Sequence, residues 1–360
     1  MNLELTAKCN LRCVYCSKSF SEAEDKRVLE MPEEWIASSI GTLWRRGLWF
    51  VITSGIGETT LRRGWERICR SLHERGLTLS IISNFARPLS DKSVATLVRY
   101  KSIQVSVDTA DTELFARIRR GGQLEVLLRN IDRVRSFARS SGVRAPTFRF
   151  DVVVTDKTVI GLPDLVRLGL RHGVSDFYFA NLLKGPDTKG PFNVYNADML
   201  PRAELTRAAD ALEEACDLAR SAGCVVECHP GLRESLRQSS RGHSATVKLS
   251  WGAARVRTGM TRNCAEPWKY VFLYADGQVR PCCAYDVAVG DLRTQTLEEV
   301  LNGPPIRELR GKLLSGDLSG TLCECCSMRP EIPTREFRKR IGGLRILWSI
   351  RRRTLNLLHH

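Results

Sequence analysis

Short apolar segments alternate with helical patterns over the first 230 residues, and this alternation constrains the fold more than any other feature of the chain. The strand candidates are rich in Val, Ile or Phe and cover Asn2–Ala7, Trp49–Ser54, Leu77–Ser83, Ile103–Asp108, Thr147–Thr155 and Asp176–Ala180. The helical patterns cover Pro32–Arg46, Leu61–Glu74, Asp91–Tyr100, Asp111–Ser140 and Leu162–His172. Near-continuous apolar strands separated by helices indicate a parallel sheet that helices cover. Six such units are too few for a closed eight-unit barrel, so we expect an α/β fold with an open, partial (β/α)6 barrel.

The remaining chain changes character near residue 230 and again near residue 260. A helix is expected over Pro201–Ala222, a strand over Cys224–Cys228, and helical structure over Thr296–Leu314. The polar stretch 231–259 is typical of a linker. We therefore predict a barrel over residues 1–230, the linker 231–259, a small cysteine-dense domain over 260–330 and a basic tail over 331–360.

Composition limits the class of protein. The 360 residues contain 13 cysteines, and 55 Lys and Arg against 40 Asp and Glu leave a net charge of +15. No apolar run is long enough to span a membrane, and Met1–Lys8 does not match a secretory signal, so we expect a cytoplasmic, reducing environment. Cysteines in such an environment are metal or catalytic ligands before they are disulfides. No basic run is interleaved with stacking aromatics, so we predict no nucleic-acid partner.

Three cysteines, Cys9, Cys13 and Cys16, follow the first predicted strand with the spacing C-x3-C-x2-C. Three thiolates on one tight loop suit a [4Fe–4S] cluster, in which each sulfur binds a different iron. The fourth iron then stays open to a small molecule. A structural zinc site would need a fourth protein ligand instead.

This loop, with Tyr15 before its last cysteine, resembles the signature of the radical S-adenosylmethionine (SAM) superfamily. The resemblance implies a partial (β/α)6 barrel in which the open iron binds the amino and carboxylate groups of SAM. It also implies that one electron from the cluster, delivered by a flavodoxin- or ferredoxin-type donor, cleaves SAM. The resulting 5′-deoxyadenosyl radical then takes a hydrogen atom from a substrate.

Further SAM contacts are implied by the same resemblance. The stretch Thr53–Thr59 resembles the family's Gly-Gly-Glu-Pro motif, which holds the SAM amino group, although Ile56 and Thr59 depart from it. It carries over to Gly55, Gly57 and Glu58. The predicted cofactor contacts at or after strand ends are Asn84, Ser106, Asp108 and Asn181. Tyr15 of the cysteine loop is a further one, and so is Arg119, because Arg119–Gly122 resembles a family Arg-x-Gly stretch. For Asp108 the alternative is a helix N-cap.

A second cysteine group contains Cys264, Cys282, Cys323 and Cys326. Asp276-Gly277 predicts a hairpin turn before Cys282, and Cys323 and Cys326 form a C-x2-C pair. Four thiolates from a hairpin and a later loop can enclose a second [4Fe–4S] cluster. The arrangement resembles the SPASM and shorter twitch extensions of radical SAM enzymes, with one auxiliary cluster. Cys283 or Cys325 is left open as a substitute ligand, and a zinc ribbon is the alternative.

These features predict a radical SAM oxidoreductase or epimerase with two [4Fe–4S] clusters and SAM, acting on a small polar substrate such as a sugar or aminocyclitol. The single auxiliary cluster and the position of Cys9 near residue 1 favour that substrate. Modification of a ribosomally made peptide is the alternative, and a zinc-stabilised nucleic-acid-binding protein is a distant one. Cys228 is the candidate hydrogen donor of an epimerase, with core packing as its alternative. The basic tail predicts docking on the enzyme itself, on a membrane surface or on an acidic partner.

Overall fold

The computed structural model describes residues 1–16, 30–182, 193–240, 255–326 and 328–343. The chain divides into two compact units. The terminal unit combines Met1–Ala7, Leu29–Gly55 and Lys248–His360, and the central unit combines Lys8–Val28 and Ile56–Val247. Each unit is described by itself.

The central unit contains a run of parallel strands in the order β4-β5-β7-β8-β9. Their bounds are β4 Thr78–Ser83, β5 Ser102–Ser106, β7 Thr147–Val154, β8 Asp176–Asn181 and β9 Val225–Cys228. Its helices are α2 Trp65–Glu74, α3 Asp91–Leu97, α4 Thr112–Ile118, α5 Leu124–Ser140, α6 Leu162–Arg171, α7 Arg202–Ser221 and α8 Pro230–Ser240. Short 3-10 turns are η2 Thr59–Leu61, η3 Val159–Gly161 and η4 Ala197–Met199, and β2 Arg12–Cys13 pairs with β6 Arg119–Arg120.

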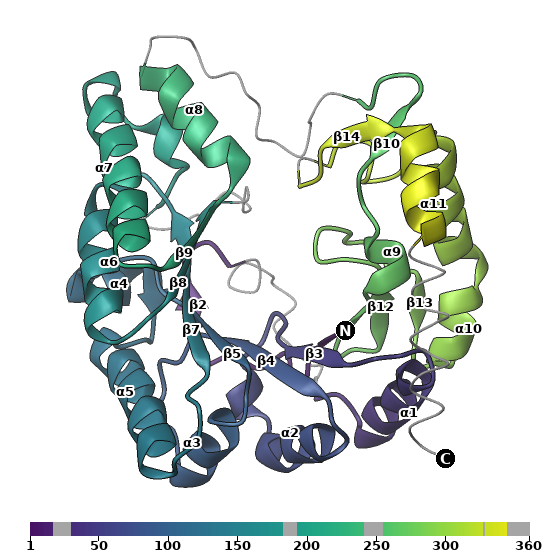
Figure 1. Ribbon diagram of the computed structural model, residues 1–360, viewed down its shortest axis with the longest axis horizontal. Coiled ribbons are helices and arrows are strands. Elements are labelled where there is room, and N and C mark those ends of the chain that lie inside the picture. Colours follow the sequence, from purple (N-terminus) through teal and green to yellow (C-terminus); the bar gives the residue numbers. More distant parts are fainter. Residues whose placement is uncertain (17–29, 183–192, 241–254, 327, 344–360) are drawn as a thin grey trace. The chain divides into compact units, whose positions relative to one another are not determined.

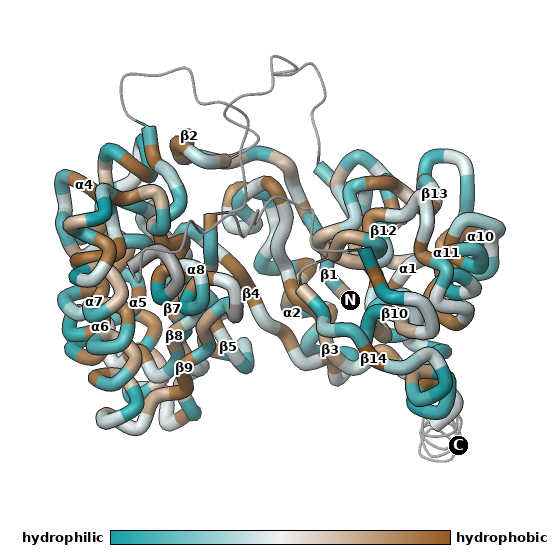
Figure 2. The backbone as a smooth tube through the Cα atoms, turned by 90° about the horizontal axis from the view of Figure 1, so that it is seen from above, coloured by the Kyte–Doolittle hydropathy of each residue, from teal (hydrophilic) through white to brown (hydrophobic). Residues whose placement is uncertain are grey.

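One face of this sheet is apolar and carries the helices α5, α6 and α7 (Figure 1). Phe150, Phe177 and Phe179 are fully buried on it, with ring centroids 5.8 Å apart for Phe150 and Phe177. Gly169 of α6 lies so close that a Cβ atom there would meet the Phe177 ring at 2.9 Å. Hydrophilic and hydrophobic residues alternate along α6 and α7 (Figure 2), as expected of helices with one buried face. The residues between these phenylalanines therefore point to the opposite face of the sheet.

The terminal unit contains strands in the order β13-β12-β11-β1-β3. Strand β1 Asn2–Leu3 runs parallel to both β3 Phe50–Thr53 and β11 Phe272–Leu273, while β12 Gln278–Arg280 and β13 Gly290–Asp291 are antiparallel. Strand β10 Met260–Arg262 pairs with β14 Glu331–Pro333. The helices are α1 Glu33–Trp44, α9 Glu266–Lys269, α10 Leu297–Asn302 and α11 Pro304–Ser315. The chain's first strand thus pairs with a strand that begins near residue 272.

The mostly parallel α/β fold is the predicted one, and all six predicted strands are present, five of them shorter than predicted and β8 one residue longer. The segment Asp111–Ser140 differs, because it forms two helices instead of one. Between α4 and α5 the chain runs through β6 and Gly121, whose φ of 92° is open mainly to glycine. Part of the predicted linker is also helical, since α8 extends to Ser240. Residues 241–254 of that linker lie outside the described residues.

The described part of the tail packs on the terminal unit. After β14, residues 334–343 are helical, and Phe337 and Ile341 are buried. The Phe337 ring meets Trp268 edge-on with centroids 5.9 Å apart. This agrees with docking on the enzyme itself for residues 331–343, while 344–360 lie outside the described residues. No helix among the described residues is long and apolar enough to cross a membrane.

Candidate active site and auxiliary cysteine site

The first cysteine loop is fastened to the central unit by a short antiparallel pair. Cys13 of β2 lies opposite Arg119 of β6, and the Val14 backbone N–H donates to the Ile118 carbonyl at 2.9 Å. The Cys16 N–H donates to the Cys13 carbonyl at 3.1 Å, which closes a turn. The interruption between α4 and α5 therefore provides strand β6, which pairs with β2 and holds the cysteine loop in place.

The three sulfurs lie in surroundings that suit a cluster. The Leu11 N–H and the Asn84 Nδ2 point at the Cys9 Sγ at 3.5 and 3.7 Å, and Arg119 Nη1 lies 4.0 Å from the Cys13 Sγ. Hydrogen bonds to cluster sulfurs stabilise thiolates and tune the potential. Burial raises the pKa of Cys13 to about 11, with smaller contributions from the neighbouring thiols. A cationic iron cluster would offset that unfavourable burial of a thiolate, so the residues present fit the group.

Glu58 is the centre of a buried hydrogen-bond network. Its carboxylate is 2% exposed and accepts hydrogen bonds from the Thr60 N–H and hydroxyl, the Ser83 hydroxyl and the Asn84 N–H, at 2.8 to 3.1 Å. Its own N–H donates to the Lys8 carbonyl at 2.7 Å, next to Cys9. Glu58 thus connects the end of β4 to the start of the cysteine loop. Its predicted contact with the SAM amino group stays a prediction.

A second buried network joins Asp108, Arg119 and Tyr15. Arg119 donates to both carboxylate oxygens of Asp108 at 2.9 and 3.0 Å. The same carboxylate accepts hydrogen bonds from the Tyr15 hydroxyl at 2.7 Å and from the Val153 N–H at 3.0 Å. Burial by itself disfavours the charged guanidinium, but Asp108 beside it holds the pKa of Arg119 above its usual value. The helix after Asp108 is capped by Asp111 instead, whose side chain accepts from the Leu114 N–H at 2.7 Å. Three predicted cofactor residues therefore meet beside Cys13.

The other predicted cofactor residues are less closely gathered. Asn181 ends β8, is 8% exposed, and its Nδ2 has no acceptor among the described residues. Ser106 ends β5 and is half-buried. Gly57 directly precedes Glu58. Gly55 belongs to the terminal unit, where a Cβ atom would lie 2.1 Å from the Glu4 side chain, so its smallness makes room for that buried carboxylate.

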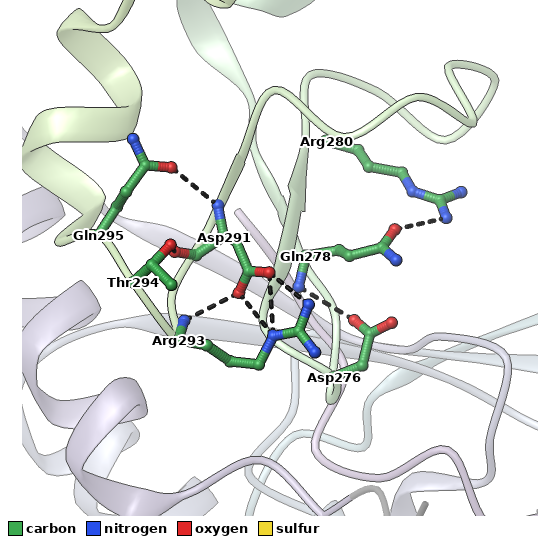
Figure 3. A network of polar contacts seen from close by, with 7 residues as sticks. All are labelled: Asp276, Gln278, Arg280, Asp291, Arg293, Thr294 and Gln295. Carbon is green, nitrogen blue, oxygen red and sulfur yellow. Dashed lines mark hydrogen bonds and ion pairs between the residues drawn. The ribbon is translucent and has the colours of Figure 1, made fainter.

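Cys264 lies between β10 and α9, and Cys282 directly follows the β11–β12 hairpin of the terminal unit, which turns at Gly277 with a φ of 91°. The Gln278 N–H donates to the Asp276 carboxylate at 3.0 Å, and Arg280 Nη2 donates to the Gln278 Oε1 at 2.9 Å (Figure 3). In β13, Asp291 forms an ion pair with Arg293 at 2.5 Å (Figure 3). These contacts are local, and the backbone pairing of β11 with β12 forms the hairpin whose second strand leads into Cys282.

Four of the auxiliary cysteines influence one another. Burial is the largest cause that raises the pKa of Cys323 to about 12, and the thiols of Cys264, Cys282 and Cys326 add to it. The pKa of Cys282 is likewise raised to about 12 by burial, with contributions from the thiols of Cys283, Cys264 and Cys326. This mutual influence supports the predicted set, which contains Cys282, although Cys283 also lies near it. Among the described residues no three acidic, cysteine or histidine side chains converge tightly enough for a single metal ion.

Sequence reasoning did not find several residues that hold these sites in place. Arg262 is 5% exposed and donates to the carbonyls of Cys323 and Glu324 at 3.3 and 2.9 Å, which positions the C-x2-C loop. Thr60 and Ser83 surround Glu58 in the first site. A polar residue at a strand end signals Ser83, but a single arginine in an arginine-rich chain carries no signal for Arg262.

Cys228 lies apart from the residues around Cys9. It is the register partner of Phe179, and therefore shares the helix-facing side of the sheet. Burial is the largest cause that raises the pKa of Cys228 to about 11, and the nearby Cys216 thiol of α7 raises it further. Its place among α7 and α8 agrees with the packing alternative.

A cysteine triad fixed beside a parallel sheet, together with a second cysteine group on a hairpin and loop, defines an iron–sulfur protein of the α/β class. A model of the radical SAM superfamily matches residues 3–149, and a SPASM model, described as an iron-sulfur cluster-binding domain, matches residues 264–327. The chain therefore contains a radical SAM domain and, in its C-terminal region, a SPASM domain, as the sequence predicted. These domains imply SAM and two [4Fe–4S] clusters as cofactors.

Similar proteins have diverse names. The tungsten-containing aldehyde ferredoxin oxidoreductase cofactor-modifying protein of Pyrococcus furiosus is 27% identical over 195 residues, which cover 50% of this chain and 51% of that one. A GTP 3′,8-cyclase of Rhodopseudomonas palustris is 26% identical, over 81% of this chain and 78% of that one. The chain thus spans about half the length of the first of these relatives.

A similar solved structure is Streptococcus suis SuiB bound to S-adenosylmethionine. It has a TM-score of 0.59 at 17% identity, covering 91% of this chain and 71% of that one. SuiB bound to precursor peptide SuiA has a TM-score of 0.57 at 16% identity, covering 91% and 70%. At these identities the likeness shows the fold.

Proposed function

We propose that this protein cleaves SAM reductively and uses the resulting radical to abstract a hydrogen atom from a ribosomally made peptide. The observation that carries the SAM chemistry is the loop of Cys9, Cys13 and Cys16, held between two buried polar networks. When bound, the reduced cluster supplies the electron that cleaves the SAM sulfonium.

The chain's own residues prepare that reaction by fixing the loop. Glu58 ties the start of the loop to β4, and the Asp108–Arg119 pair ties its end to β5 and β7. Tyr15 is held rigidly because its hydroxyl donates to Asp108 while Arg119 lies over its ring, 5.7 Å from the centroid. Such fixed groups reduce the reorganisation that the reaction needs.

The peptide alternative has better support than the small polar substrate. A neighbour with the same fold over 91% of this chain, SuiB, is described with a bound precursor peptide. No described contact favours a sugar or aminocyclitol. The SPASM match supports an auxiliary cluster, whose cysteines Cys264, Cys282, Cys323 and Cys326 we propose as ligands.

The first experiment measures SAM chemistry in anaerobically reconstituted protein with dithionite as the reductant. We expect about eight irons per chain, from two four-iron clusters, and formation of 5′-deoxyadenosine. Cys13→Ala should lose roughly half of the iron and all 5′-deoxyadenosine. Full SAM cleavage by that variant would refute the assignment of the first cluster.

The second experiment identifies the substrate class. Short open reading frames that flank the gene are co-expressed with the protein, and the peptides are analysed by mass spectrometry. A changed peptide mass that requires both Cys13 and SAM supports the proposal. If the protein forms 5′-deoxyadenosine only with a small metabolite, the peptide proposal is wrong although the SAM chemistry stands.

A further inference from the structure

Polar side chains form a row across the face of the central sheet that the helices do not cover. Ser106 of β5 pairs in register with Asp151 of β7, Asp151 with Tyr178 of β8, and Tyr178 with Glu227 of β9. Because side chains alternate along a strand, these four point away from the buried phenylalanines. We name them the carboxylate row.

The carboxylate row lies close to the first cysteine site. Ser106 is the last residue of β5 and stands two residues before Asp108, and Asp151 is two residues before Val153, whose N–H donates to Asp108 at 3.0 Å. Two residues of a strand span about 7 Å. The side chains of the carboxylate row therefore lie about two residues along the strand direction from the buried Asp108–Arg119 pair.

A single guanidinium partly balances the row. Arg149 lies one layer further along β7 and binds Asp151 at 2.6 and 3.2 Å and the Gln104 Oε1 at 2.5 Å. It also lies over the Tyr178 ring, 5.4 Å from the centroid. Its Nε and Nη2 donors are thus already engaged by Asp151 and Gln104.

Negative charge remains in excess on this face. Asp151, Glu227 and Asp176, the register partner of Arg149, carry three carboxylates. Arg149 is the cation that binds Asp151 directly, and the nearby Arg119 is already paired with Asp108. Within the described part of the chain, Glu227 and Asp176 form no ion pair. Burial raises the pKa of Asp151, Arg149 opposes the shift, and the Glu227 carboxylate reinforces it. The carboxylates of Asp151 and Glu227 therefore repel each other, and a positive group between them would relieve the repulsion.

We propose that Asp151 and Glu227 determine specificity by binding a lysine or arginine side chain of the substrate next to the reacting position. This inference rests on the proposed function, since it names a property of the peptide that the same site would accept. Carboxylates bind ammonium and guanidinium groups through charge-assisted hydrogen bonds, and Asp151 and Glu227 flank Tyr178 from either side.

The test uses three labelled eleven-residue peptides of Gly, Ser and Ala that differ only at the central position, which is Lys, norleucine or Glu. Binding to the reconstituted, SAM-loaded protein is measured by fluorescence anisotropy. The whole chain has a net charge of +15, so general attraction favours the Glu peptide. We expect the reverse order, with the Lys peptide bound about tenfold more tightly than the Glu peptide.

The decisive variant is Glu227→Lys, which should reverse the preference toward the Glu peptide, while Glu227→Gln should only weaken it. Glu214→Lys makes the same charge change on the surface of α7, where Glu214 pairs with Arg167 at 2.7 Å, and should leave the order unchanged. Equal or undetectable binding of the three peptides, or a Lys preference that survives Glu227→Lys, would overturn the inference. Formation of 5′-deoxyadenosine by each variant is measured in parallel, so that a failure of the SAM chemistry is recognised separately.

Discussion

At the scale of single residues, Glu58 shows how a motif residue can hold a site together. Its buried carboxylate receives donors from Thr60, Ser83 and Asn84, which come from two separate segments of the chain. The sequence motif marked Glu58 as functional, but the motif contains no information on these partners. The fold brings these partners together, because Thr60 lies in η2 while Ser83 ends β4 and Asn84 follows it.

Replacing Glu58 by Gln tests this role. A glutamine puts an amide NH2 against at least one backbone N–H, of Thr60 or Asn84, that cannot accept a hydrogen bond, so we expect the free energy of unfolding to fall by about 1–3 kcal/mol. Formation of 5′-deoxyadenosine should fall as well, because the start of the cysteine loop loosens. Urea unfolding and product analysis measure the two effects. Glu74→Gln at the end of α2 is the matched control, and an equal loss in both variants would contradict the role.

Unlike Glu58, Cys228 is not expected to affect the SAM chemistry. Because its thiol lies on the helix-facing side, Cys228→Ala should leave 5′-deoxyadenosine formation unchanged. Burial raises the pKa of this thiol to about 11 in the folded protein, above the usual 8.5 of the unfolded chain. Its contribution to stability is therefore full below pH 8.5 and is lost as the pH rises toward 11. Between pH 8 and pH 10.5, urea unfolding should show a smaller fall in the free energy of unfolding for the variant than for the wild type. Loss of product turnover in the variant would instead restore Cys228 as a hydrogen donor.

At the scale of elements, the β2–β6 pair was the least predictable part of the site. The helical pattern of Asp111–Ser140 continues through Arg119, and the periodicity indicates one long helix. Tertiary contacts override it, since Arg119 gains a buried partner in Asp108 and a strand partner in Cys13 only if the helix is broken. Strand positions could be predicted because their apolar composition is local. The break could not, because its stabilisation comes from residues eleven and about a hundred positions away.

The Asp108–Arg119 pair makes a prediction about coupling. Removing one buried charge leaves the other unpaired, so Asp108→Asn or Arg119→Met should each cost about 3–5 kcal/mol of stability. The double variant should cost much less than the sum, because no lone charge remains. A double-mutant cycle by urea unfolding measures this coupling, and additive losses would show that the two side chains act independently.

The auxiliary loop offers a matched pair of cysteines. We expect Cys282→Ala to lose roughly half of the iron, because the second cluster is proposed to use four protein thiolates, one on each iron, and this variant removes one of them. Cys325→Ala should keep the full iron content, since Cys325 is not one of the four proposed ligands. Iron and sulfide analysis with electron paramagnetic resonance distinguishes the two. Should Cys282→Ala keep its iron while Cys283→Ala loses it, the ligand would be Cys283.

At the scale of the whole molecule, the sequence predicted the order of segments better than their grouping in space. The α/β class, the two cysteine sites and the tail were visible in local patterns. The pairing of β1 with β11, across about 270 residues, was not, because both strands are short and no local signal connects them. The two compact units also differ from a simple succession along the chain, since the first and last segments share one unit.

The tail contributes to that shared unit, which leads to a prediction for Phe337. This ring is fully buried against Trp268, and removing it in Phe337→Ala should cost about 3–5 kcal/mol. Leu344→Ala, beyond the described residues, serves as the comparison for the distal tail. Thermal unfolding of the reconstituted protein measures both. An unchanged midpoint in Phe337→Ala would mean that the proximal tail does not dock stably.

The pairing of the first strand with residues near 272 also has a consequence for biosynthesis. Ribosomes add about 5–20 residues per second, so Asn2 waits roughly 15 to 55 seconds before its partner Phe272 has been made. During that interval the nascent chain presents an incomplete sheet edge, a hydrogen-bonding template for wrong partners. Rare codons between the two cysteine sites would lengthen this exposure, and the yield of folded protein in cells should depend on translation speed and chaperone supply.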